Sequence, residues 1–219
     1  MTSPTPEPVE EELADRLSAR HRRVQSSRVV RVLRQLGRID RAAYRTVADM
    51  HTQPLDRPLR RVSDFADFSK PWFLIAGVLA LFGGARGRRA AVTGVAALGL
   101  NSLLVNQSIK LISERRRPDR TEHSVPRSRW VRMPGSNSFP SGHSASAAAF
   151  AFSVGDMLPP FRVPLRAAAA IVAFSRVYTG VHYPADIVAG TAAGALVGKV
   201  TSTVALRLRA SSAQQRSSS

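Results

Sequence analysis

Five apolar runs separated by polar segments limit what this 219-residue chain can fold into. The runs cover residues 72–82, 90–112, 144–158, 167–178 and 187–206. No strand-like alternation bounded by turn residues competes with them. The pattern therefore predicts an all-α protein, built as a helical bundle of about five core helices.

The apolar runs favour a bundle in a membrane without requiring one. A helix needs about 20 residues to cross the hydrocarbon, and only the second and fifth runs reach that length comfortably. In the fifth run, Gly190, Gly194 and Gly198 recur every four residues, a spacing that allows close helix contacts in lipid. A soluble bundle stays open, because the mean hydropathy of −0.10 is low and soluble helices can use the same glycine spacing.

Polar segments flank the apolar runs and suggest the boundaries of the chain's parts. We expect a disordered tail over 1–27, a basic amphipathic helix and proline-broken linker over 28–61, a core domain over 62–208 and a disordered tail over 209–219. In the second segment, apolar residues recur at spacings of three and four, with arginines between them. Such a helix can lie on an anionic membrane surface or pack on its own domain, and both readings stay open.

The net charge of +17, from 32 basic and 15 acidic residues, predicts an anionic partner. Nucleic acid, a membrane surface and a phosphorylated substrate are the three classes that such a charge favours. Aromatic residues make up only 6% of the chain, so stacking platforms for single strands are not expected, and we expect no nucleic-acid partner. The absence of cysteine excludes disulfides and thiolate metal sites.

A first cluster that could carry chemistry is KLISERRRP, from Lys110 to Pro118. Lys110 and Arg117 are seven residues apart, so they share one face if the helix persists that far. Two aligned cations could clamp a phosphate, with the arginine binding two oxygens at once. For Arg115 and Arg116 we favour the simpler reading, a basic flank of a membrane helix.

A second cluster is PSGH, from Pro140 to His143. Ser141 is a natural N-cap for the helix that follows, and Gly142 lets a ligand approach the backbone closely. The amides of that helix N-terminus could bind an anion, with His143 beside them as a proton donor. The alternative is an ordinary capped helix with a surface histidine.

A third cluster lies in SRVYTGVHYPAD, residues 175–186. His182 precedes Asp186 by four residues across a turn that Gly180 permits. A carboxylate bonded to one ring nitrogen fixes the tautomer and leaves the other nitrogen as a nucleophile or base. Arg176 and Asp186 border apolar runs, where charges are costly unless they are paired or functional.

Together and in this order, the three clusters resemble the three-part signature of the type 2 phosphatidic acid phosphatase (PAP2) superfamily, which also holds bacterial acid phosphatases and vanadium haloperoxidases. All three parts match without a substitution, and the resemblance covers roughly residues 72–206. It implies an all-helical fold, and the apolar runs favour the membrane branch that acts on lipid phosphates. Members of that branch usually have six spanning helices, whereas five are plausible here.

The resemblance also implies roles for individual residues. His182 would attack phosphorus and form a phosphohistidine, with Asp186 orienting its ring. His143 would protonate the departing alkoxide and then activate the water that releases phosphate. The phosphoryl oxygens would be held without a metal or other cofactor by Lys110, Arg117, Ser141, Gly142 and Arg176.

We therefore expect a metal-independent phosphatase that hydrolyses lipid phosphomonoesters or diphosphates, with phosphatidic acid and polyprenyl phosphates or diphosphates both open as substrates. Its expected location is the cell membrane, as a multi-pass protein. Two alternatives remain: a vanadium-dependent haloperoxidase, and a non-catalytic basic membrane protein that binds anionic lipid.

Overall fold

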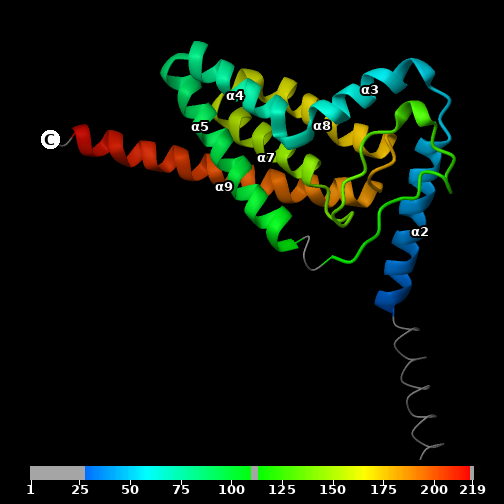
Figure 1. Cartoon of the computed structure of the whole chain (residues 1–219). Coiled ribbons are helices and arrows are strands. Elements are labelled where there is room, and N and C mark those ends of the chain that lie inside the picture. The colour runs from blue at the N-terminus through cyan, green and yellow to red at the C-terminus, as the bar shows by residue number, and fades with distance from the viewer. Residues whose placement is uncertain (1–27, 110–112, 218–219) are drawn as a thin grey trace, which may run out of the picture. The chain divides into compact units, whose positions relative to one another are not determined.

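The computed structural model describes residues 28–109 and 113–217, and within these ranges it is helical without strands. The described ranges contain seven α-helices: α2 (Arg28–Ala48), α3 (Gln53–Phe65), α4 (Lys70–Phe82), α5 (Gly84–Asn101), α7 (Gly142–Met157), α8 (Arg162–Tyr178) and α9 (Pro184–Ser217). The all-α prediction is confirmed (Figure 1). The tail expected at 1–27 lies outside the described residues.

The chain divides into two compact units, Met1–Ala42 and Ala43–Ser219, and the bundle belongs to the second. Each of the five apolar runs corresponds to one bundle helix: α4, α5, α7, α8 and α9 in chain order. The second run continues beyond α5 as a π-helix, η2 (Ser102–Ile109). The predicted helix count therefore holds for the core of the bundle, to which α3 is added.

Helix α7 lies at the centre of the bundle, in contact with α5, α8 and α9 (Figure 1). Most of its side chains are buried alanines and serines, which let the neighbouring helices come close. Its largest buried side chain, Phe150, packs against Trp72 of α4 with 5.5 Å between the ring centroids. The core therefore holds α7 firmly, and α7 carries the PSGH motif at its N-terminal end.

The glycines of α9 face α7, as their spacing predicted. A Cβ atom added at Gly194 would overlap the carbonyl group of Ala145, and one at Gly190 would overlap the carbonyl of Ser141. The amide of Ser141 also donates to the carbonyl of Asp186, with 3.0 Å between nitrogen and oxygen. Close packing of α9 on α7 thus places the start of one helix against the start of the other.

This packing predicts that Gly194→Ala destabilises the protein. The added methyl group has no room, and overpacking of this kind costs about 1–3 kcal/mol of unfolding free energy, which lowers Tm by roughly 2–10 °C at this size. The matched control is Gly77→Ala in α4, where an added Cβ meets nothing within 4 Å. Thermal unfolding of the detergent-purified variants checks this, and equal Tm shifts for the two would contradict the packing argument.

Two segments differ from the sequence-based expectation. The proline-broken linker is part of α3, because Pro54 lies in its first turn, where proline is tolerated, and buried Asp56 anchors it through an ion pair with Arg129 of 2.8 Å. The expected C-terminal tail is helical as far as Ser217, since α9 continues through residues 209–217. Alanine, glutamine and arginine in this stretch are compatible with a helix, and its described side chains are exposed.

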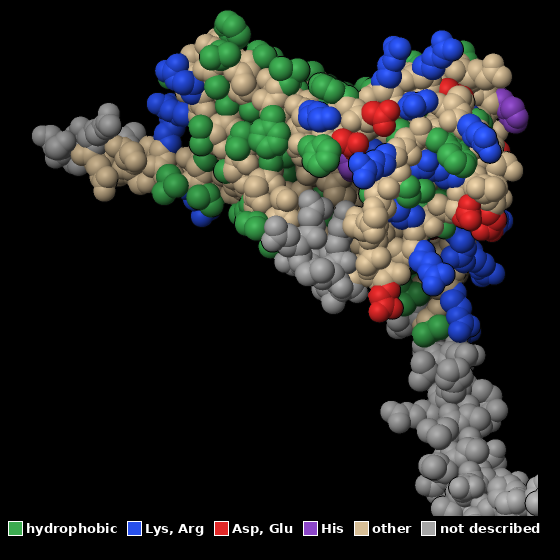
Figure 2. All heavy atoms as spheres, viewed as in Figure 1, with side chains coloured by type: hydrophobic (Ala, Val, Ile, Leu, Met, Phe, Trp, Pro, Cys, Tyr) green, Lys and Arg blue, Asp and Glu red, His purple; other side chains and the backbone are tan. Residues whose placement is uncertain are grey.

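Large apolar side chains face outward on α4, α5, α8 and α9, and Figure 2 shows many of them over α4 and α5. Among the described helices, α9 is long and apolar enough over Pro184–Ser212 to cross a membrane, and α3 with Asp67–Phe82 would make a second span bent by 67°. Exposed apolar surface of this extent is typical of a membrane or protein contact. The expectation of several spans stays a prediction.

Candidate active site

His182 lies in the turn between α8 and α9, and it is almost completely buried. Its Nδ1 atom is 3.5 Å from Oδ2 of Asp186, which lies in the first turn of α9. Asp186 is held in turn by three donors: Ser138 Oγ at 2.5 Å, the amide of Tyr183 at 2.9 Å and Arg115 Nη1 at 2.7 Å. The carboxylate is therefore fixed in position and faces one nitrogen of the imidazole.

The other ring nitrogen of His182 faces Arg117. Nη1 of Arg117 is 3.1 Å from Nε2 of His182, and it also donates to the carbonyl of Val181 at 2.8 Å. Since a guanidinium can only donate, Nε2 accepts, and the ring proton resides on Nδ1. This tautomer places the lone pair of the ring on Nε2, where it accepts from Arg117 in this structure.

The charge state of His182 agrees with a nucleophilic role. Burial lowers the pKa of His182 far below the ordinary value for histidine, and the positive charges of Arg117 and Arg176 lower it further against the opposing effect of Asp186. Burial also lowers the pKa of Arg117 to about 10, which keeps it cationic at neutral pH. A neutral imidazole is thus surrounded by cations that attract a phosphate.

Arg176, in the last turn of α8, supplies the most distinctive feature of the site. It is 1% exposed, and its Nη1 donates to the hydroxyl and the carbonyl of Ser63 on α3, at 2.7 and 3.1 Å. Its Nε and Nη2 atoms are buried and have no hydrogen-bond partner among the described residues. A buried cation with two unsatisfied donors is costly unless an anion binds them.

His143 lies in the first turn of α7. Its Nε2 is 2.8 Å from Oδ1 of Asp67, and the same oxygen is 3.9 Å from Arg176 Nη1. Asp67 therefore joins the second histidine to the buried arginine. The hydrogen bond with His143 lowers the pKa of Asp67 below its ordinary value, so a charged carboxylate lies beside this imidazole.

The PSGH turn forms the N-terminus of α7 as expected. Ser141 is the N-cap, and its Oγ accepts from the amide of Ser144 at 3.4 Å and from the hydroxyl of Ser144 at 3.0 Å. Gly142 is the first residue of the helix, so its amide is one that lacks an intrahelical partner. These amides and the helix dipole favour an anion at this end of α7.

The structure thus forms two groups of side-chain contacts, Arg117–His182–Asp186 and His143–Asp67–Arg176. The two groups are joined where the amide of His182 donates to the carbonyl of Arg176 at 3.2 Å. Lys110 lies outside the described residues, and its expected role stays a prediction. The condition for Lys110 and Arg117 to share one helix face is not met, because Arg117 lies in a non-helical segment, residues 113–118. Proline disfavours the helical conformation of the residue before it, so Pro118 is consistent with a non-helical Arg117.

Three residues of the site are additions to the sequence-based set: Arg115, Ser138 and Asp67. Arg115 was read as a membrane-helix flank, yet it pairs with Asp186 and lies 4.4 Å from the ring of Tyr183. Its position two residues before Arg117 is the signal that could have grouped the two arginines. Ser138 and Asp67 carry no comparable signal, since each is far in sequence from its partner.

Comparisons with known sequences identify related proteins. Residues 90–210 match the model of the PAP2 superfamily. A decaprenylphosphoryl-5-phosphoribose phosphatase of Mycobacterium tuberculosis is 33% identical over 159 residues, which cover 68% of this chain and 83% of the relative. A lipid A 1-phosphatase of Rhizobium johnstonii is 41% identical over 70 residues, covering 32% of this chain and 29% of the relative.

Solved structures show the same fold. A transmembrane PAP2-type phosphatidylglycerolphosphate phosphatase from Bacillus subtilis superposes with a TM-score of 0.62 at 22% identity, covering 84% of this chain and 90% of the other. A bacterial vanadium-dependent iodoperoxidase superposes with a TM-score of 0.57 at 18% identity, covering 81% of this chain and 49% of the other. At these identities the likeness concerns the fold.

Proposed function

Because the chain belongs to the PAP2 superfamily, we propose that it is a phosphatase that hydrolyses lipid phosphomonoesters or diphosphates through a phosphohistidine on His182. The observation that carries this proposal is the buried guanidinium of Arg176, whose Nε and Nη2 atoms lack partners among the described residues. A phosphoryl group would supply hydrogen-bond acceptors for both of these atoms. It would then lie beside the neutral imidazole of His182, which Asp186 orients.

In the first step, the Nε2 lone pair of His182 attacks phosphorus, and the bond between phosphorus and the leaving oxygen breaks. His143 donates its proton to that oxygen, so the lipid leaves as an alcohol or a phosphate. Asp186 stabilises the positive charge that develops on the ring of His182. Arg117 and Arg176 neutralise the phosphoryl oxygens as charge redistributes.

In the second step, water attacks the phosphohistidine. His143, now neutral, accepts a proton from the water, the phosphorus–nitrogen bond breaks, and inorganic phosphate leaves. His182 returns to its neutral state and His143 to its protonated state. The residues named supply the nucleophile, the proton and the charge, and none of these steps requires a metal.

A lipid is the substrate class that the relatives favour. The two curated relatives are named for phosphatases of decaprenylphosphoryl-5-phosphoribose and of lipid A, both lipid phosphates. The outward apolar side chains of the bundle helices suit a protein that meets such substrates in a bilayer. We extend the proposal to residence in the cell membrane with several spans.

The test is phosphate release by the purified protein from detergent-dispersed lipid phosphates in excess EDTA. We expect activity to survive EDTA unchanged, because cations of the chain replace the metal of other phosphoryl-transfer enzymes. Magnesium added back serves as the control. An enzyme that is inactive in EDTA and regains activity with magnesium would contradict this mechanism.

A further inference from the structure

A pocket of about 470 Å³ opens beside His143 and is distinct from the cluster around His182. It is lined by residues of the turn between α3 and α4, the loop 132–136 and the first turns of α7, where His143 and Ser146 lie. Its volume lies in the range of small-molecule sites. The described lining residues include neither His182 nor Arg176.

The proposed chemistry places the leaving group in this pocket. In an in-line displacement the nucleophile and the leaving oxygen lie on opposite sides of phosphorus. A general acid must reach the leaving oxygen within hydrogen-bond distance, so the atoms beyond that oxygen lie next to His143. Ser136 connects the two regions, because it lines the pocket and its carbonyl accepts from Arg117 Nε at 2.8 Å.

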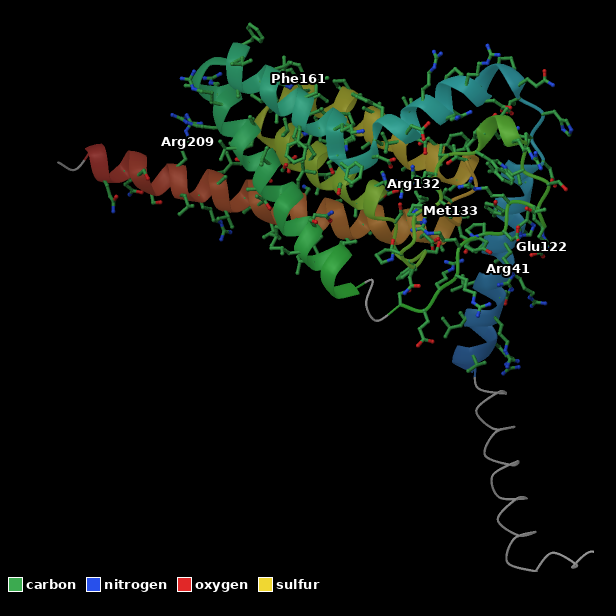
Figure 3. All side chains as sticks on the ribbon, viewed as in Figure 1. Arg41, Glu122, Arg132, Met133, Phe161 and Arg209 are labelled. Atoms are coloured by element: carbon green, nitrogen blue, oxygen red, sulfur yellow. The ribbon has the colours of Figure 1, made fainter. Side chains whose placement is uncertain are left out.

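Arg132 gives this pocket a positive charge. Figure 3 labels Arg132 and its neighbour Met133, both of which line the pocket. The guanidinium of Arg132 forms no hydrogen bond or ion pair within the described part of the chain, whereas Arg120 and Arg129 on the same loop are bonded to carbonyl groups. The carboxylate of the pocket, Asp67, is already bonded to His143.

The other residues that line the pocket suit the apolar part of an organic leaving group. Phe68 is 86% exposed and has a left-handed backbone conformation with φ of 57°, as does Ser69 with φ of 59°. Two consecutive non-glycine residues in this region are strained, and such strain is concentrated at functional sites. Phe68 and Met133 supply apolar contacts, and Arg132 supplies the charge.

We infer that Arg132 binds a second phosphate group in the leaving group of the substrate. The inference rests on the proposed function and narrows it: preferred substrates carry the scissile phosphate joined to another phosphate, rather than to an uncharged diacylglycerol. The second group can be a phosphodiester in the head group or the inner phosphate of a diphosphate. Arginine suits either, because its planar donors match two phosphate oxygens.

The experiment compares Arg132→Gln with the wild type on three short-chain lipids in detergent. Phosphatidic acid has an uncharged leaving group, phosphatidylglycerol phosphate has a phosphodiester in it, and diacylglycerol diphosphate has a phosphate in it. We expect kcat/KM to fall about 10- to 100-fold for at least one of the last two, as for a lost charged hydrogen bond. For phosphatidic acid, kcat/KM should stay within about threefold of the wild-type value. The substrate with the largest fall in kcat/KM identifies the source of the second phosphate.

The matched control is Arg116→Gln, which removes the same charge from an exposed position outside the pocket lining. It should leave all three substrates unaffected. The inference is overturned if Arg132→Gln lowers all three rates equally or none of them, or if Arg116→Gln reproduces its pattern. Those results leave the proposed function standing, whereas a wild type that hydrolyses none of the lipids overturns both.

Discussion

His182→Ala is expected to abolish turnover, with kcat lowered on the order of 10⁴-fold or more. The variant lacks the atom that we propose forms the covalent intermediate, and no described residue beside it can replace that atom. Arg115, Arg117 and Ser138 surround Asp186 and His182, but arginine is no nucleophile at neutral pH and Ser138 Oγ is bonded to Asp186. Phosphate release at saturating lipid measures the loss.

Two measurements separate a chemical role of His182 from a structural one. His51→Ala, at an exposed histidine on the segment before α3, should retain wild-type activity. With substrate labelled in the scissile phosphate, the wild type quenched during turnover should carry acid-labile label, and His182→Ala should carry none. Residual activity above about 1% of the wild type, in a variant with an unchanged Tm, would contradict the assignment of the nucleophile.

The parts of the site that are local in sequence could be predicted. His182 and Asp186 are four residues apart across a turn, and Ser141 precedes an apolar helix, so short-range rules were sufficient for both. The glycine spacing in α9 likewise predicted a close helix contact, and Gly194 lies against Ala145 of α7. In each case the sequence signal lies within one helix or turn.

The parts that depend on tertiary packing could not be predicted. Asp67 meets His143 across 76 residues and Ser138 meets Asp186 across 48, so no spacing rule connects them. The contact of Arg115 with Asp186 was not predicted because residues 113–118 are not helical, whereas the apolar run suggested a longer helix. The α3 segment was missed for a related reason, since its buried anchor, the pair of Asp56 with Arg129, joins positions 73 residues apart.

Arg176→Lys is expected to lower kcat about 10²- to 10³-fold, as for the removal of one preorganised donor to a developing oxyanion. Lysine keeps the positive charge, but its ammonium group is a point charge and cannot reproduce the planar set of donors. In the native site, one part of the guanidinium is bonded to Ser63, which leaves Nε and Nη2 for the phosphoryl group. A lysine that satisfies Ser63 would have no second fixed donor in the right place.

Orthovanadate resembles the pentacoordinate phosphorus of the transition state. Its inhibition constant should change if Arg176 binds the phosphoryl group, and should not change if Arg176 has only a structural role. Its inhibition constant should rise for Arg176→Lys roughly as kcat falls, because both depend on the same donors. The control is Arg166→Lys on the same helix, whose side chain pairs with Asp156. If Arg176→Lys binds vanadate as tightly as the wild type, or if Arg166→Lys loses as much activity, Arg176 does not hold the phosphoryl group.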